Sequence, residues 1–155
     1  MKLRTSILAT LSILAAFMVD QVTKMIVFSN AKTLQTGIEV FSGFDLVFFQ
    51  NGGVTFGMLA GFPWWGLTLL AIGICCWLIV LITRTHSRLE ACAYGIIIGG
   101  ALGSVIDRVR FGAVTDFLDF HVGNIHWPAF NFADAFVVGG VAILILAPII
   151  SKVHR

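Results

Sequence analysis

Four stretches of this chain are long enough and apolar enough to cross a membrane, a span that takes about 20 helical residues. They run from about residue 5 to 28, 64 to 83, 91 to 109 and 130 to 150. Because lipid offers no hydrogen-bond partners, a spanning segment has to satisfy its own backbone, and a helix does so. The sequence therefore predicts an all-α membrane protein with four transmembrane helices.

The composition supports a single membrane-embedded unit. Of the 155 residues, 58% are hydrophobic and 12% are charged, whereas a soluble domain carries about 25% charged residues. One domain over residues 1–155 is expected. The net charge of +2 gives no reason to expect nucleic acid as a partner. Cys75, Cys76 and Cys92 lie in apolar segments and are expected to be small buried side chains without disulfides.

The positions of the basic residues predict the orientation in the membrane. If the helices alternate in direction, one side holds Lys2, Arg4, Arg84, Arg88, Lys152 and Arg155, and the other holds Lys24, Lys32, Arg108 and Arg110. The positive-inside rule assigns the richer side to the cytoplasm. Both termini are then expected to be cytoplasmic, with residues 29–63 and 111–128 outside.

The first outer segment, residues 29–63, is predicted to form a small hairpin or sheet. Its β-prone runs at residues 38–41 and 44–49 are separated by Ser42-Gly43, and an Asn-Gly-Gly turn follows them. The segment is apolar enough to rest on the membrane surface. The second outer segment connects the third and fourth helices.

The third helix carries Gly95, Gly99 and Gly103 at a spacing of four residues. Small residues at this spacing let two helix backbones approach closely in lipid. These glycines therefore predict a packing seam between helices.

Two aspartates lie near the outer ends of the last two helices, Asp116 in the second outer segment and Asp134 where the fourth helix begins. A carboxylate beside lipid is unfavourable, and its presence indicates a function. The connection between them re-enters the membrane, so its ends should return to a similar depth. Two converging carboxylates hold one proton between them. The ionised one can then activate water while the protonated one polarises a peptide carbonyl, which predicts an aspartic peptidase.

Each aspartate taken alone also has a structural explanation. Asp134 follows Asn131 by three residues near a helix start, which is the spacing of a capping box. Asp116 alone fits a surface aspartate in a loop, as does Asp119. Only the combination of the two favours catalysis.

Other polar side chains belong to the same outer edge. Asp20 and Lys24 are four residues apart on the first helix and can form an ion pair, which is a structural role. Arg108 can bind a substrate carbonyl or a phosphate, or it can extend to the lipid headgroups. Asn51 can hold peptide backbone or form an ordinary Asn-Gly turn.

Competing chemistries have less support in the sequence. His121 and His126 lie near the aspartates, but no HExxH or HxH pattern is present, so no metal site is expected. Ser104 lacks a histidine at its depth, which disfavours a serine protease. A small proton-coupled transporter would place ionisable residues near helix midpoints, and the second and fourth helices have none there.

Five segments in order carry a resemblance to a known family. They are DQVTK at residues 20–24, NGGVTFG at 51–57, GGALGSVIDR at 99–108, VTDF at 114–117 and PAFNFAD at 128–134. On these segments the chain resembles the lipoprotein signal peptidases (signal peptidase II) of bacteria over nearly its whole length.

The resemblance implies four transmembrane helices, a small extracytoplasmic β-cradle and a catalytic dyad of Asp116 and Asp134 near the extracytoplasmic face of the bacterial inner (cytoplasmic) membrane. The implied substrates are prolipoproteins that carry diacylglycerol on a cysteine and are cut just before it, without metal or cofactor. Membrane lipids and globomycin-type inhibitors are the other expected partners, and a monomer is expected.

The resemblance also assigns substrate-contacting and supporting positions: Asn51, Arg108, Asn131 and Ser104 for contact, and Asp20 and Lys24 for support. Ser104 stands where the family usually has Asn, and Thr55 stands where it usually has Ala. Serine is shorter and lacks the amide, so a weaker contact with substrate or inhibitor is expected there. A non-catalytic lipoprotein-binding paralogue is the alternative to the peptidase.

Overall fold

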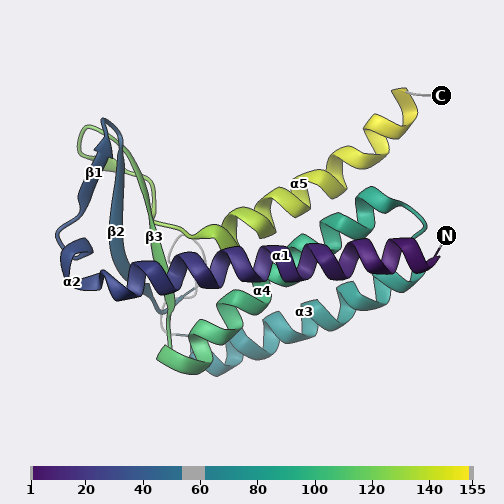
Figure 1. The fold of residues 1–155 in the computed structure, drawn as a ribbon, viewed down its shortest axis with the longest axis horizontal. Helices are drawn as coiled ribbons and strands as arrows, with labels where there is room; N and C mark the ends of the chain where they lie inside the picture. The colour runs from purple at the N-terminus through teal and green to yellow at the C-terminus, as the bar shows by residue number, and fades with distance from the viewer. Residues whose placement is uncertain (1, 54–61, 154–155) are drawn as a thin grey trace.

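The computed structural model describes residues 2–53 and 62–153. Within them, long helices form a bundle and an antiparallel sheet stands at one end of it (Figure 1). The helices are α1 (Lys2–Ser29), the short α2 (Ala31–Leu34), α3 (Trp64–Arg84), α4 (Arg88–Phe111) and α5 (Phe132–Val153). The strands are β1 (Ile38–Phe41), β2 (Phe44–Asn51), β3 (Val114–Val122) and β4 (Ile125–His126). α1 begins and α5 ends at the end of the bundle opposite the sheet.

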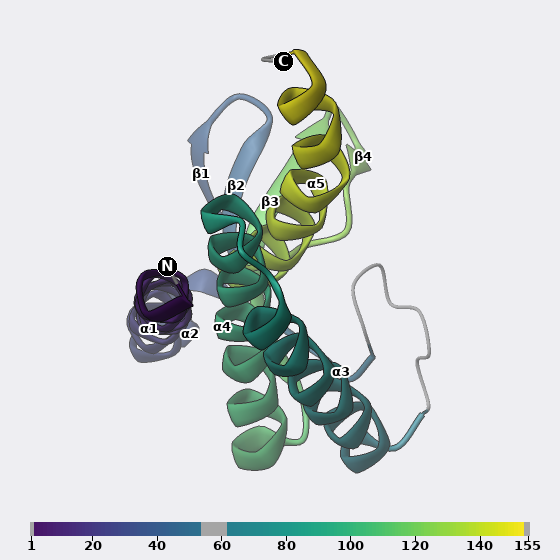
Figure 2. The same ribbon diagram turned by 90° about the vertical axis from the view of Figure 1, so that its right-hand side faces the viewer.

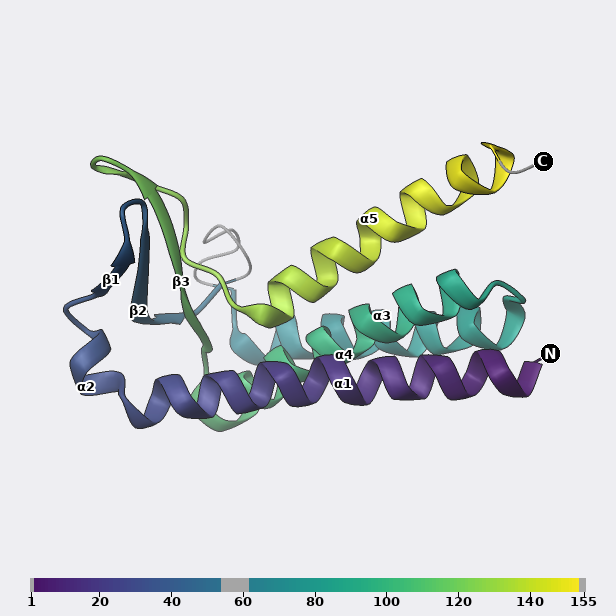
Figure 3. The ribbon, with the colours of Figure 1, turned by 45° about the horizontal axis from the view of Figure 1, so that its top comes forward.

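The long helices coincide with the four predicted spans to within about three residues at each end. Three of them, Leu3–Ser29, Trp64–Arg84 and Arg88–Phe111, are long and apolar enough to cross a membrane. In α5 the apolar part described is Phe132–Ala147, a shorter stretch. α5 begins at Phe132 because Phe130 pairs with Leu118 beside the sheet instead of joining the helix. Figure 3 shows α5 diverging from the other helices toward its C-terminal end.

α4 is the central helix and packs against α1, α3 and α5 (Figure 2). Its predicted glycine seam is confirmed, because a Cβ at Gly95 or Gly99 would lie 2.5 Å from the carbonyl oxygen of Ala9 or Ile13 on α1. These close approaches are possible only without side chains. They hold α1 and α4 together along the half away from the sheet, and the polar residues of the site lie further along the same two helices, toward the sheet.

The sheet has the order β1-β2-β3-β4 with antiparallel neighbours. The predicted β1–β2 hairpin is confirmed, and Gly43 in its turn has a φ of 95°, which glycine adopts without strain. No strand was predicted within the second outer segment, which connects α4 and α5. It forms β3 and β4, with Val114 opposite Asn51 and Asp116 opposite Phe49.

A small apolar core attaches the sheet to the helices. Phe117 of β3 is 3% exposed and packs with the buried Val27 of α1 and Leu34 of α2, with Phe132 of α5 against them. Successive side chains of a strand point to opposite faces. Burial of Phe117 on one face of β3 therefore turns Asp116 toward the other.

Candidate active site

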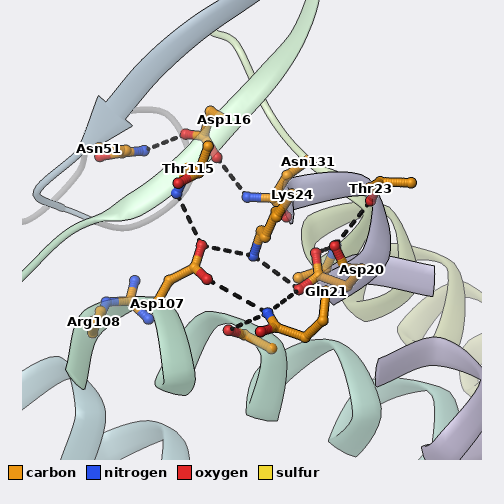
Figure 4. A network of polar contacts seen from close by, with 12 residues as sticks. Asp20, Gln21, Thr23, Lys24, Asn51, Asp107, Arg108, Thr115, Asp116 and Asn131 are labelled. Atoms are coloured by element: carbon orange, nitrogen blue, oxygen red, sulfur yellow. Dashed lines mark hydrogen bonds and ion pairs between the residues drawn. The ribbon is translucent and has the colours of Figure 1, made fainter. Parts of the chain in front are cut away.

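Asp116 is buried at the base of the sheet with a donor on each carboxylate oxygen. The side-chain amide of Asn51 at the end of β2 donates to its Oδ2 at 2.9 Å, and the amide of Asn131 donates to its Oδ1 at 2.5 Å. The residue is 1% exposed. Figure 4 shows the two amides meeting the carboxylate from different elements.

Asn131 connects Asp116 to Asp134. Its side-chain oxygen accepts from the backbone N–H of Asp134 at 3.1 Å, and its own backbone N–H donates to Asp134 Oδ2 at 3.2 Å. This reciprocal pair is a capping box at the start of α5. The structural alternative for Asp134 is therefore confirmed, and the same asparagine also bonds the other aspartate.

Backbone pairing holds the two aspartates at the same level. The N–H groups of Phe117 and Leu118 both donate to the carbonyl oxygen of Phe130, at 3.0 and 2.9 Å, and Phe130 donates back to Leu118 at 3.1 Å. These bonds tie β3 to the segment that leads into α5. The two ends of the connection thus return to one place, as the sequence predicts.

A buried ionic cluster lies beneath this pairing, between α1 and α4 (Figure 4). Lys24 Nζ is 2.9 Å from Asp20 Oδ2 and 3.2 Å from Asp107 Oδ2. Asp20 accepts the backbone N–H of Ala133 at 2.9 Å, and Asp107 accepts that of Thr115 at 3.1 Å. The predicted Asp20–Lys24 ion pair is confirmed, and its cluster anchors the residues that precede both aspartates.

Gly103 is required for this cluster to fit. A Cβ on Gly103 would occupy the position of the Asp20 carboxylate. The side chain of Gln21 fills the remaining space and donates to Asp20, to the Gly103 carbonyl and to Asp107 at 3.2 to 3.4 Å. Gly103, the last glycine of the α4 seam, thus makes room for the Asp20 carboxylate, whereas Gly95 and Gly99 make room for the backbone of α1.

Both aspartates line one pocket of about 210 Å³ between the sheet and helices α3, α4 and α5. Its polar wall holds Asn51, Ser104, Arg108, Asp116 and Asp134. Arg108 is 7% exposed, and its Nη2 donates to the carbonyl oxygen of Gly53 at 3.0 Å. The deeper wall is apolar and includes Leu70 and Ile74 of α3 and Val137 of α5. The pocket therefore combines a polar wall with an apolar wall supplied by the long helices.

The surroundings of Asp116 favour its protonated form. Burial raises the pKa of its carboxyl from 3.8 to about 7. The negative charge of Asp134 adds to this shift, whereas the hydrogen bonds from Asn51 and Asn131 and the charge of Lys24 oppose it. Near neutral pH this carboxyl can hold or release a proton, which is the property that general acid–base catalysis needs.

The residues singled out from the sequence divide into two groups. Those that line the pocket are Asn51, Ser104, Arg108, Asp116 and Asp134. Those that lie behind it, each less than 5% exposed, are Asp20, Lys24 and Asn131. Thr55 falls outside the described residues.

Sequence reasoning missed the structural role of Asp107. Its signal was present, since an ionisable residue inside a predicted spanning helix indicates a buried partner. His121 and His126 stack with each other in the sheet and contact Asp45 and Asp119. Among the described residues, no group of three or more His, Cys, Asp or Glu side chains is arranged to hold a metal ion.

Comparisons with known proteins agree on one family. The family model described as signal peptidase (SPase) II matches residues 12–150. The lipoprotein signal peptidase of Azoarcus sp. (strain BH72) is 43% identical over 142 residues, which cover 88% of this chain and 79% of the relative. That of Aeromonas hydrophila is 41% identical over 136 residues, covering 84% of this chain and 81% of the relative.

Solved structures agree with this fold. Two of them, both described as bacterial membrane enzymes, superpose on the chain with TM-scores of 0.83 and 0.78 at 27% and 29% sequence identity. The first comparison covers 95% of this chain and 90% of the other, and the second covers 90% of each.

Proposed function

The chain belongs to the signal peptidase II family, and on this premise we propose that it is an aspartic endopeptidase that removes signal peptides from diacylglyceryl-modified prolipoproteins. Membership of this family supports the activity of a membrane peptidase that processes signal peptides. One observation carries the aspartic mechanism. Asp116 and Asp134 are joined through Asn131 on the wall of a single pocket, and the more buried of them has a pKa of about 7.

The resting pair holds one proton, and Asp116 is its site because burial disfavours the charged form there. Asp134 is less buried and opens on the same pocket, so its carboxylate is the base that faces water. The negative charge of Asp134 further raises the pKa of the Asp116 carboxyl. The pair is active when one member is charged and the other is neutral.

In the reaction, Asp134 takes a proton from water, and the resulting hydroxide oxygen attacks the carbonyl carbon of the residue that precedes the lipidated cysteine. Asp116 gives its proton to the carbonyl oxygen, which produces a neutral tetrahedral diol. Return of a proton from Asp134 to the cysteine nitrogen breaks the C–N bond, and the diol hydroxyl returns its proton to Asp116. The products are a signal peptide with a free carboxyl and a lipidated cysteine with a free amine.

The remaining pocket residues are suited to hold the substrate backbone. Arg108 uses one N–H on Gly53, which leaves other guanidinium donors for a substrate carbonyl. Asn51 and Ser104 add polar groups on the same wall. The apolar wall from α3 and α5 suits the signal peptide, while the diacylglyceryl chains stay in the bilayer.

Three residues behind the pocket act as positioning residues. Asn131 is fully buried and bonded to both aspartates, so we assign it to their orientation and not to substrate contact. Asp20 and Lys24 hold the start of α5 and the strand of Asp116 through the ionic cluster. A catalytic pair needs such support to keep its geometry.

We further propose that all four long helices span the bacterial inner membrane, with both termini in the cytoplasm and the sheet on the outer surface. The sheet stands at the end opposite the two termini, as this topology requires.

A single copy contains every residue of the site, so the protein acts as a monomer. Globomycin-type inhibitors are expected to occupy the pocket.

The proposal is tested by cleavage of a diacylglyceryl-modified prolipoprotein, with its unmodified form beside it. Purified wild type should cut only the modified form, at the bond before the cysteine, as a gel shift and the product mass would show. Asp116→Asn and Asp134→Asn should lose activity by several orders of magnitude while remaining folded.

Asp119→Asn is the matched control. Asp119 lies on the same strand as Asp116, but its carboxylate contacts His126 at 2.9 Å, away from the pocket. The control should cleave as fast as wild type. Folded wild type that binds the modified substrate without cutting it would instead support the non-catalytic paralogue.

A further inference from the structure

A second cavity lies between α1 and α4, on the other side of α4 from the active-site pocket. It measures about 470 Å³, within the range of about 300–1,000 Å³ that small-molecule sites occupy. On α4 it is lined by Ile106 and Arg110, four residues apart, whereas Ser104 and Arg108 line the first pocket. We call this second cavity the α1–α4 groove.

The α1–α4 groove has the length and the lining of a site for a lipid chain. Its wall on α1 runs from Phe17 to Ser29, which is about 18 Å of helix at about 1.5 Å per residue. One leaflet of hydrocarbon is about 15 Å thick. Met18, Val22 and Met25 on this wall are 54%, 40% and 63% exposed. These apolar side chains have no protein to cover them among the described residues.

The outer end of the groove carries an exposed cation. Arg110 lies in the last turn of α4, at the same end as the sheet. Its guanidinium makes no hydrogen bond or ion pair with any residue in the described ranges. Asp107 lines the same groove, and its carboxylate is already bound by Lys24 and by the Thr115 N–H. Arg110 is therefore available to an anion at the level of the lipid headgroups.

We propose that the α1–α4 groove binds one anionic glycerophospholipid, with its phosphodiester on Arg110 and an acyl chain along α1. Guanidinium donors match phosphate oxygens in geometry and charge. The wall on α1 begins at Phe17 and runs toward the end of α4 that carries Arg110, so chain and headgroup are recognised together. This site is separate from the pocket of the aspartates and does not depend on their chemistry.

The test is native mass spectrometry of the detergent-purified full chain, titrated with phosphatidylglycerol and, in parallel, with phosphatidylcholine. Wild type should retain one phosphatidylglycerol in preference to phosphatidylcholine. Arg110→Gln should weaken the phosphatidylglycerol complex by about tenfold, because the headgroup loses a charge-assisted contact. Equal retention of both lipids by wild type, or unchanged retention by the variant, would overturn the proposal.

Arg84→Gln is the matched control, since Arg84 is also exposed in the last turn of a spanning helix, but at the opposite end of the bundle. It should bind phosphatidylglycerol like wild type, and an equal loss in both variants would mean that any surface arginine suffices. Inorganic phosphate should not displace the lipid. Displacement by phosphate would assign Arg110 to a soluble anion instead.

A phosphatidylglycerol with a diazirine on its acyl chain localises the site. Label should concentrate on Met18, Val22 and Met25, and Arg110→Gln should reduce it. The N-terminal half of α1 supplies an internal control, because Leu3 and Leu11 there are 75% and 57% exposed. Label spread evenly along α1 would indicate ordinary surrounding lipid and would overturn the proposal.

Discussion

Replacing Asn51 by alanine should move the alkaline limit of catalysis to higher pH. Asn51 donates a 2.9 Å hydrogen bond to Asp116 Oδ2, and this bond lowers a pKa that burial has raised to about 7. The mechanism needs the proton on Asp116, so wild-type activity should fall as pH rises through about 7. Without the bond the carboxyl keeps its proton to a higher pH.

The size of the shift follows from the strength of the bond. A hydrogen bond to a charged group contributes about 1.5–3 kcal/mol, and one to a neutral group about 0.5–1.5 kcal/mol. The midpoints of these two ranges differ by about 1.3 kcal/mol in favour of the ionised form, which corresponds to about one pKa unit. The midpoint of the alkaline limb should therefore rise by about one pH unit.

The assay is kcat/KM for a diacylglyceryl-modified prolipoprotein across the pH range around neutrality. Asn51 also lines the pocket, so kcat/KM should be lower at every pH, and only the midpoint tests the reasoning. Gln50→Ala removes the exposed amide next to it on β2 and should leave the midpoint unchanged. A midpoint that stays in place in Asn51→Ala, or moves to lower pH, would refute this account of Asp116.

Three further predictions concern stability and affinity. The folded protein keeps the Asp116 proton up to about pH 7, whereas the unfolded chain releases it near pH 3.8. The free energy of unfolding should therefore fall by up to about 4 kcal/mol as the pH rises from 3.8 to 7. In Asp116→Asn, Tm should therefore decrease less between pH 5 and pH 8. Gly103→Ala should destabilise by about 3 kcal/mol because its Cβ meets Asp20, whereas Gly73→Ala, with open space around it, should not lower Tm. Ser104→Asn should lower the substrate KM and the globomycin inhibition constant at unchanged kcat, and unchanged constants would remove Ser104 from the contact surface.

The helices and the first hairpin were predictable because their determinants are local. A long apolar run fixes a spanning helix by length alone, and the Ser42-Gly43 turn lies between two short β-prone runs. The strand β3 was not predicted. Its partner is β2, so that Val114 pairs with Asn51 across two intervening helices, and a pattern within residues 111–128 does not reveal that pairing.

The residues of the candidate site could be predicted from the sequence, but which of them line the pocket and which are buried behind it could not. Asp134 looked like either a helix-capping residue or a catalytic one, and the structure shows the capping box on an aspartate that also lines the pocket. Asn131 matched a contact position, yet it is fully buried between the two aspartates. Burial arises from the packing of several elements, which spacing along one segment does not report.

Asp107 is a site residue whose role could not be predicted from the sequence. Its neighbour Arg108 drew attention as a possible substrate contact, and the aspartate itself did not. Its carboxylate joins Lys24 of α1 to the Thr115 N–H of β3, so it links three elements that are distant in sequence. Only the glycine seam, which brings α1 close to α4, makes that link possible.

The most direct test of the central claim is whether the two aspartates act as one unit. Single-turnover cleavage rates of Asp116→Asn, Asp134→Asn and the double variant would be compared with wild type on the same prolipoprotein. Residues that share one step are strongly non-additive, so the double variant should be no slower than either single variant. Losses that multiply in the double variant, or a single variant that retains normal turnover, would contradict the shared-proton mechanism.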